Sequence, residues 1–196
     1  MSGSLQARFR EALPAVDFCS LRHVRSRDEH LAVRQNVPEP MSCTDDEGAM
    51  VTVVHRGGMG YAATSDLSLG GLRRAIETAQ RFAAMTAGRS VFDFGRVPMP
   101  ASVGRYRGPE AIAWDALSLA AKFELLRDVS AALKIDPRIC DWHASLWHTR
   151  LETAIFTSSG GCVEQSFNLV APALAVAASH KGDSQTRSLG SLRGPC

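Results

Sequence analysis

The side chains best suited to metal chemistry are six histidines and five cysteines spread along the chain. A zinc site needs three or four such ligands, usually at short and regular spacings, yet the sequence contains no C-x-x-C, H-x-H or H-E-x-x-H. His143 and His148 are five residues apart on a predicted strand, where an odd separation places them on opposite faces. His23 and His30 flank a predicted turn and could approach each other, but no third ligand is evident near them. We therefore predict no metal ligand in this chain.

Two glycine-rich segments could serve phosphate binding or nucleophilic catalysis. Residues 56–60, Arg-Gly-Gly-Met-Gly, lead from His55, which we expect to face solvent, into a second predicted strand, whereas phosphate-binding loops lead into a helix. Residues 158–161, Ser-Ser-Gly-Gly, precede Cys162, but the sequence has no G-x-S-x-G. An activated thiolate usually lies at a helix N-terminus or beside a base, and Cys162 opens a predicted strand. We interpret both segments as structural turns and predict no catalytic or cofactor-binding residue.

The three tryptophans are Trp114, Trp142 and Trp147. Tryptophan is more often an anchor of a core or an interface than the wall of a ligand site. Because Trp142 and Trp147 are separated by an odd number of positions, we expect them on opposite sides of one strand. One of the two is therefore a candidate for a partner surface.

Composition excludes several classes of protein. The net charge is only +2, with 22 basic and 20 acidic residues interspersed, which does not indicate a nucleic-acid partner. The basic run at 22–27 is followed by two acidic residues, and we read it as the solvated side of a strand entering a turn. The cysteines are odd in number and far apart, as expected in a reducing compartment. The longest apolar stretch, 169–179, contains a proline and is shorter than a membrane helix of about 20 residues, and the first twelve residues are not a signal peptide. We expect a cytoplasmic protein without a membrane partner.

The amino-terminal half of the chain predicts strands followed by a helix. We expect a short helix over 5–13, and strands over 16–25 and 30–35 that are joined by a turn at 27–29. A β-branched run at 50–55, the glycine-rich turn and a return strand at 61–64 predict a hairpin. Ser65 or Ser68 then caps a helix, whose apolar residues recur at spacings of three and four. Those apolar residues are Leu69, Leu72, Ile76, Ala79 and Ala83.

The second half predicts a helix followed by a meander. A helix over 116–134 should present Leu119, Phe123, Leu126, Val129 and Leu133 on its apolar face. The meander has predicted strands at 139–148, 151–157, 162–167 and 170–179. The fold class is therefore α+β, with antiparallel hairpins and a meander, two long helices packed on the sheet, and possible internal duplication. We expect a unit at 1–87, a connector at 88–109, a helix-plus-meander unit at 110–183, and an unpaired tail at 184–196.

The segment 48–68, Gly-Ala-Met-Val-Thr-Val-Val-His-Arg-Gly-Gly-Met-Gly-Tyr-Ala-Ala-Thr-Ser-Asp-Leu-Ser, followed by an amphipathic helix, resembles the amino-terminal signature of the TldD/PmbA family, also described as modulators of DNA gyrase. Val-Arg-Gln-Asn at 33–36, Lys-Phe-Glu-Leu-Leu at 122–126 and the hairpin at 158–165 are similar to its neighbouring elements. The stretch 180–187 is similar to the region just before the family's metal motif. The resemblance covers most of the chain.

The resemblance implies a zinc metallopeptidase that acts on small or unfolded peptides within a dimer. The family's H-E-x-x-x-H motif would lie beyond the end of this sequence, so the resemblance assigns no metal, cofactor-binding or catalytic residue here. It assigns structural roles only, with Gly57, Gly58 and Gly60 in the turn and Asp66 and Ser68 at the helix start. We therefore expect a shortened, amino-terminal, non-catalytic portion that is inactive alone.

The resemblance leaves two alternatives open. The chain could be a PmbA-like, non-metal partner or regulatory subunit that forms a homo- or heterodimer with a TldD-type protein. The family's association with regulation of DNA gyrase gives a further alternative, for which the modest net charge offers no support.

Overall fold

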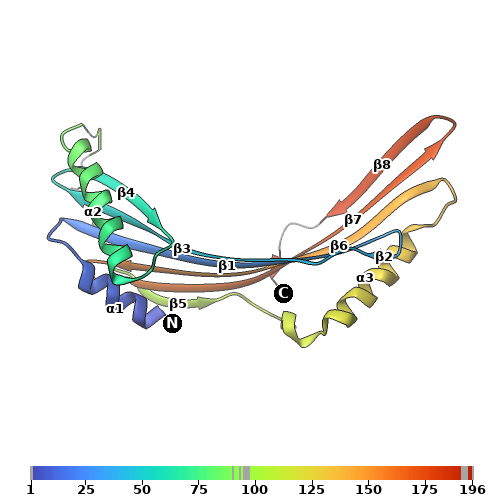
Figure 1. Cartoon of the computed structure of the whole chain (residues 1–196), viewed down its shortest axis with the longest axis horizontal. Helices are drawn as coiled ribbons and strands as arrows, with labels where there is room; N and C mark the ends of the chain where they lie inside the picture. Colours follow the sequence, from blue (N-terminus) through green and yellow to red (C-terminus); the bar gives the residue numbers. More distant parts are fainter. Residues whose placement is uncertain (1, 90, 93, 95–97, 191–193, 196) are drawn as a thin grey trace. The chain divides into compact units, whose positions relative to one another are not determined.

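The computed structural model describes residues 2–89, 91–92, 94, 98–190 and 194–195. This part of the chain contains three α-helices, a short 3-10 helix (η2) and nine strands, so the α+β class is confirmed. The strands form one sheet with the order β4-β3-β1-β6-β7-β5, while β2 pairs with β1, and β8 and β9 pair with β7 (Figure 1). The helices are α1 Ser2–Ala12, α2 Leu69–Thr86, η2 Trp114–Ala116 and α3 Leu119–Leu133. The strands are β1 Phe18–Arg34, β2 Val37–Pro38, β3 Ser42–His55, β4 Gly58–Thr64, β5 Val103–Arg107, β6 Ile139–Thr157, β7 Cys162–His180, β8 Asp183–Gly190 and β9 Gly194–Pro195.

The chain divides into two compact units. Unit 1 comprises Met1–Arg25, Asp46–Arg107 and Glu152–Ser166. Unit 2 comprises Ser26–Asp45, Gly108–Leu151 and Phe167–Cys196. These boundaries differ from those we expected at 87 and 110, because β1, β3, β6 and β7 each contribute residues to both units. No helix in the described part of the chain has the length and apolar character needed to cross a membrane.

The long strands contradict the sequence-based segmentation. β1 continues through residues 27–29, where we predicted a turn, and β6 and β7 each replace two predicted strands. Asp28 shows why β1 does not turn, since its carboxylate accepts hydrogen bonds from Trp147 Nε1 (3.1 Å) and from the Thr149 hydroxyl on β6. Cross-strand partners of this kind override the local preference of polar residues for turns.

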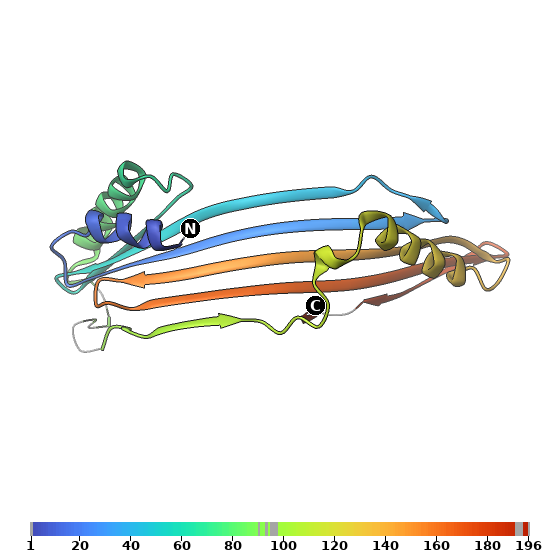
Figure 2. The ribbon, with the colours of Figure 1, turned by 90° about the horizontal axis from the view of Figure 1, so that it is seen from below.

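Unit 1 packs α1 and α2 on one face of its strands (Figure 2). Phe9 on α1 contacts Phe156 on β6, with ring centroids 6.5 Å apart, and both side chains are 1% exposed. The rest of this core includes Leu5, Leu21, Val51, Val53, Leu72, Ile76 and Ala79. The predicted apolar stripe of α2 is confirmed, since four of its five residues are buried and Leu69 packs against the same core.

The start of α2 follows the prediction. The Ser68 side chain accepts a hydrogen bond from the backbone N–H of Gly71 (3.1 Å), which satisfies one of the free donors of the first turn. Asp66 accepts from the N–H of Ser68 (3.0 Å) and pairs with Arg74 (2.6 Å). Both contacts lower the pKa of Asp66, and the hydrogen bonding with Ser68 has the larger effect.

Replacing Ser68 with alanine should lower the free energy of unfolding of unit 1 by about 1 kcal/mol, because the Gly71 N–H loses its acceptor. A glycine at the same position should cost only a few tenths of a kcal/mol, as glycine is tolerated at helix N-caps. Urea denaturation followed by circular dichroism measures both changes. Equal losses for the two variants would contradict a capping role.

The glycines after His55 have two different functions. Gly57 has φ +75°, so the predicted turn position is confirmed. Gly58 and Gly60 lie in β4 instead of the turn, which corrects the role we assigned to them. A Cβ at Gly58 would lie 2.0 Å from the carbonyl oxygen of Ala83, and one at Gly60 would lie 2.2 Å from that of Ala79. The absence of side chains therefore lets α2 pack directly on β4.

The connector and the tail also differ from expectation. Residues 103–107 of the connector form β5, which pairs with β7 in parallel from Val103↔Cys162 to Arg107↔Ser166. The sheet is thus antiparallel in its other described pairings but not at this edge. Residues 184–190 of the expected unpaired tail belong to β8, which pairs with β7 from Ala173↔Gly190 to His180↔Asp183. Residues 191–193 and 196 of that tail lie outside the described residues.

Unit 2 packs α3 on its own part of the strands, around Leu31, Val33, Leu126 and Ala144. The helix begins at Leu119, later than predicted, because residues 114–116 form η2 and Ser118 caps the first turn by accepting from the N–H of Ala121 (3.1 Å). Phe123, Val129 and Leu133 pack against this core as expected, whereas Leu119 is 48% exposed. No comparison tests the internal duplication, which stays a prediction.

Candidate functional site

The histidines considered as metal ligands do not come together. His148 stacks on Trp114 on the α3 side of β6, and alternation along the strand places His143 on the other side, as predicted. His23 and His30 lie on one uninterrupted strand, so the turn that we expected to bring them together is absent. Across the described residues, no group of three or more His, Cys, Asp or Glu side chains could hold a metal ion.

The tryptophans occupy the two faces that we predicted. Trp142 is 7% exposed and lies under the ammonium of Lys134, whose Nζ is 4.4 Å from the ring centroid. Trp147 is 38% exposed on the opposite face, where its ring lies 5.2 Å from that of His30. Trp147 is therefore the more accessible of the two to a partner.

The segment at 158–161 is a structural turn. Ser158 exchanges backbone and side-chain hydrogen bonds with Cys19, at 2.8 and 3.0 Å. The hydroxyls of Thr157 and Ser159 both donate to the carbonyl of Pro100. Burial raises the pKa of the Cys19 thiol to about 12, so this cysteine is neutral and unreactive at ordinary pH. These contacts tie the hairpin to its neighbours, and no base lies among them.

His55 is less exposed to solvent than we expected. It is half-buried, and its Nδ1 lies 3.7 Å from the carboxylate of Asp17. The same Asp17 carboxylate accepts a hydrogen bond from the backbone N–H of Arg56 (2.7 Å). Asp17 thus fixes the turn at 56–57 to the segment before β1.

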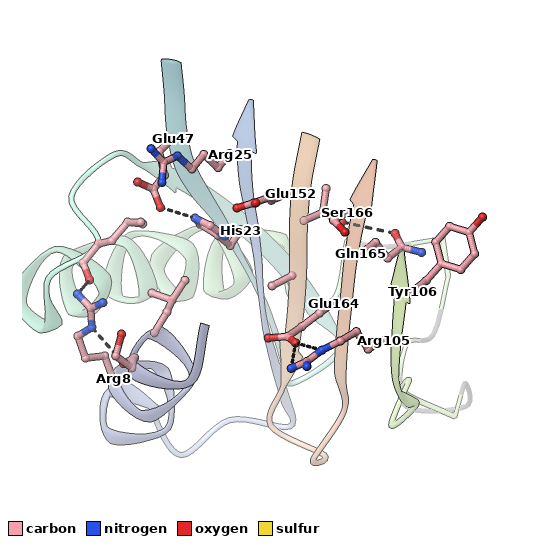
Figure 3. A pocket seen from close by; sticks show the side chains of 15 residues that line it. Arg8, His23, Arg25, Glu47, Arg105, Tyr106, Glu152, Glu164, Gln165 and Ser166 are labelled. Carbon is pink, nitrogen blue, oxygen red and sulfur yellow. Dashed lines mark hydrogen bonds and ion pairs between the residues drawn. The ribbon is translucent and has the colours of Figure 1, made fainter. Parts of the chain in front are cut away.

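A cleft in unit 1 brings several polar groups together beside apolar side chains (Figure 3). Its volume is about 270 Å³, and its lining comes from α1, β1, β3, β5, β6, β7 and the segment before α2. Leu5, Leu67 and Ala154 supply apolar surface. An apolar hollow with a few placed polar groups is the usual form of a small ligand site.

The charged side chains of the cleft form pairs between neighbouring strands. His23 Nε2 lies 2.8 Å from Glu47 Oε1, which joins β1 to β3. A guanidinium nitrogen of Arg105 lies 2.6 Å from Glu164 Oε2, which joins β5 to β7 (Figure 3). Arg8 donates to the carbonyl of Leu67 and, at 3.2 Å, to that of Ser4. Each of these charged side chains therefore has a partner within unit 1, beside the apolar surface of the cleft.

A second hollow lies in unit 2 and has a volume of about 330 Å³. Arg34 and Asp141 line it, and they form a bidentate pair at 2.9 and 2.7 Å. This pair, with Arg34 as the main cause, lowers the pKa of Asp141 to about 2. Asp141 is therefore ionised at neutral pH and is engaged with Arg34, so it is unsuited to act as a general acid.

Sequence reasoning predicted none of the cleft residues. The lining comes from short pieces of seven segments, so no spacing along the chain links them. At the amino-terminal end of β7 the polar residues Glu164, Gln165 and Ser166 are consecutive. Even the alternation typical of a half-buried strand is therefore missing there.

Residues 19–83 match the sequence profile described as PmbA/TldA metallopeptidase domain 1. This match includes the segment 48–68 and most of the following helix, which carry the resemblance, and confirms it. Residues 19–83 are therefore similar to the first domain of the TldD/PmbA family. None of the curated proteins compared with this sequence matches it.

Solved structures share the fold over almost the whole chain. A structure named as a modulator of a DNA gyrase from Thermotoga maritima is 15% identical, with a TM-score of 0.68, and the match covers 96% of this chain and 41% of that one. A structure named as a modulator of DNA gyrase from Bacteroides thetaiotaomicron is 14% identical, with a TM-score of 0.69 and coverage of 96% and 43%. TldE from Thermococcus kodakarensis is 16% identical, with a TM-score of 0.68 and coverage of 96% and 42%. This chain spans less than half the length of each.

Proposed function

We propose that this chain supplies the amino-terminal, non-catalytic region of a TldD/PmbA-type zinc metallopeptidase that, when intact, cleaves small or unfolded peptides. The match of residues 19–83 to metallopeptidase domain 1 carries the proposal. The fold shared with three longer proteins over 96% of this chain supports it. The cleft of unit 1, with its apolar surface and internally paired charges, is suited to contact a peptide segment without performing the reaction.

The residues that the structure describes do not fit a zinc ion. The full sequence contains no H-E-x-x-x-H, and the described residues contain no group of side chains that could hold a metal. In this proposal the zinc ligands and the residue that activates water belong to a part of the intact protein that this sequence does not contain. The present chain then contributes the framework beside that centre.

The alternative is a PmbA-like subunit without metal that binds a complete TldD-type protein in a dimer. One of the three structures that share the fold is named TldE, which supports keeping this alternative. Under both proposals we place the protein in the cytoplasm, in keeping with its widely spaced cysteines, of which the four described ones are free.

The purified chain, supplied with zinc, should not cleave an unstructured fluorogenic peptide above the rate of a chelator-treated sample. The reason is that no group of side chains among the described residues could hold a zinc ion that activates water. A complete TldD-type homologue serves as the positive control on the same peptide. Chelator-sensitive cleavage that co-elutes with the 196-residue chain would refute the non-catalytic assignment.

Co-expression with a complete TldD-type homologue separates the two proposals. A PmbA-like subunit should co-elute with that homologue in size-exclusion chromatography at a mass above either chain alone. A chain that elutes separately in the presence of the homologue contradicts the alternative and leaves the first proposal standing.

A further inference from the structure

The imidazole of His148 is buried beneath the segment that leads into α3. The residue is 4% exposed, and within the described structure neither ring nitrogen has a hydrogen-bond partner of normal geometry. A buried polar group without a partner is costly and usually signals a function or a strained element. His148 belongs to unit 2, whereas the residues of the cleft belong to unit 1, so a function of His148 is independent of the proposed function.

Trp114 covers His148. The two rings are stacked, with centroids 4.4 Å apart and an interplanar angle of 6°. The indole Nε1 donates to Glu29 Oε2 at 2.8 Å, and Lys122 Nζ lies 3.8 Å from the Trp114 ring centroid. We name these four residues, Glu29, Trp114, Lys122 and His148, the Trp114 clasp. The clasp holds η2 and the first turn of α3 against β1 and β6.

The charges around His148 act in both directions. Burial opposes protonation most strongly, and the ammonium of Lys122, a residue only 6% exposed, opposes it as well. Glu29 from β1, Asp115 from η2 and Asn168 from β7 favour the protonated form. The amide of Asn168 is itself held by Glu110, to which its Nδ2 donates at 3.2 Å. The net effect is that the pKa of His148 lies below the ordinary value for histidine.

We propose that the Trp114 clasp is a proton-sensitive latch, closed over neutral His148 and opened when His148 binds a proton, so that η2 and the start of α3 leave the sheet of unit 2. In the closed clasp an imidazolium would be a second buried cation beside Lys122 and stacked on Trp114, and the favourable effect of Asn168 does not offset its burial. In the open clasp the imidazolium is hydrated. Opening is therefore the response that relieves the buried charge.

The sign of the pH dependence follows from linkage. His148 in the open clasp titrates near the ordinary pKa of about 6.5, and in the closed clasp it titrates lower. The closed clasp is most stable above pH 6.5 and loses stability as the pH falls toward the lowered pKa. The open-to-closed ratio should rise about tenfold for each unit that separates the two pKa values, and should level off below both.

Trp114 fluorescence in a W142F/W147F protein measures the opening directly. We expect a red shift of emission as the pH falls from 8 to 5, with a midpoint below about 6.5. His148→Gln should abolish the transition, whereas His143→Gln, on the other face of the same strand, should leave it unchanged. A transition that persists in His148→Gln would overturn the proposal.

Two charge variants test the latch without removing His148. Lys122→Met should move the midpoint to higher pH, because one opposing cation is lost. Glu29→Gln should move it to lower pH, because the favourable charge is lost while an oxygen acceptor for Trp114 remains. An unchanged midpoint in both variants would overturn the proposal.

NMR titration of the histidine ring protons in the wild-type protein is independent of these substitutions. A His148 that titrates at or above the pKa of an exposed histidine would also overturn the proposal.

Discussion

Gly60→Ala is expected to destabilise unit 1 by roughly 3 kcal/mol, which is large for the addition of one methyl group. Its Cβ would lie 2.2 Å from the carbonyl oxygen of Ala79 and 2.5 Å from the backbone nitrogen of Ala83. Both neighbours are backbone atoms of α2, so no side chain can move aside and the helix itself must shift. Such a shift would separate Leu72 and Ile76 from the core that they share with β3.

Amide hydrogen exchange across α2 is the appropriate measurement for Gly60→Ala. All three tryptophans belong to unit 2, so their fluorescence would not report on this region. Two units can also open separately, which makes a local probe necessary. We expect faster exchange throughout α2 and smaller changes in α3.

Two other glycines provide matched controls. Gly104 on β5 has no atom within 4 Å of an added Cβ, so Gly104→Ala should change stability by less than about 0.5 kcal/mol. Gly57 is also open but has φ +75°, so Gly57→Ala should cost about 1 kcal/mol from backbone strain alone. If all three alanine variants had similar stability, the close packing of α2 on β4 could not be the reason for glycine at position 60.

Phe156→Ala should cost about 3–5 kcal/mol, the largest effect that we expect from a single substitution in unit 1. Its ring is 1% exposed and joins β6 to Phe9 of α1. Removing the ring leaves a cavity that rigid neighbours fill only in part, so the lost burial is not recovered. Urea denaturation followed by circular dichroism, together with exchange of the α1 amides, measures the loss.

Ile155 is the control for Phe156, since it is the preceding residue of the same strand and is 39% exposed. Ile155→Ala should cost well under half as much, because less apolar surface leaves contact with protein. A double-mutant cycle with Phe9→Ala should give losses that are not additive, because the two rings contact each other. Additive losses, or equal costs at 155 and 156, would contradict the packing described here.

The sequence predicted the structure correctly where the backbone hydrogen bonds of a segment are formed within that segment. The spacing of apolar residues and the cap at Ser68 predicted α2, because helical hydrogen bonds and the capping bond join residues close in sequence. The turn at Gly57 was predictable for the same reason, since only its own φ angle is at issue. The family resemblance depended on this same local stretch.

Local signals failed where a distant strand supplies the partner. Residues 27–29 are polar enough to turn, but Asp28 is held in β1 by Trp147 and Thr149, more than a hundred residues away. The parallel pairing of β5 was hidden in the same way, because a short strand in a glycine- and proline-rich connector has no distinctive pattern of its own.

The sequence by itself determined the α+β class, the position of α2 and the resemblance of residues 19–83 to a family's first domain. Only the tertiary structure decided the unbroken length of β1, β6 and β7, the reason for glycine at 58 and 60, the cleft of unit 1 and the clasp over His148. The division has one physical cause. Helix periodicity, caps and turns arise from interactions within a few residues, whereas strand length, close packing and the burial of a histidine depend on which distant atoms come to lie beside them.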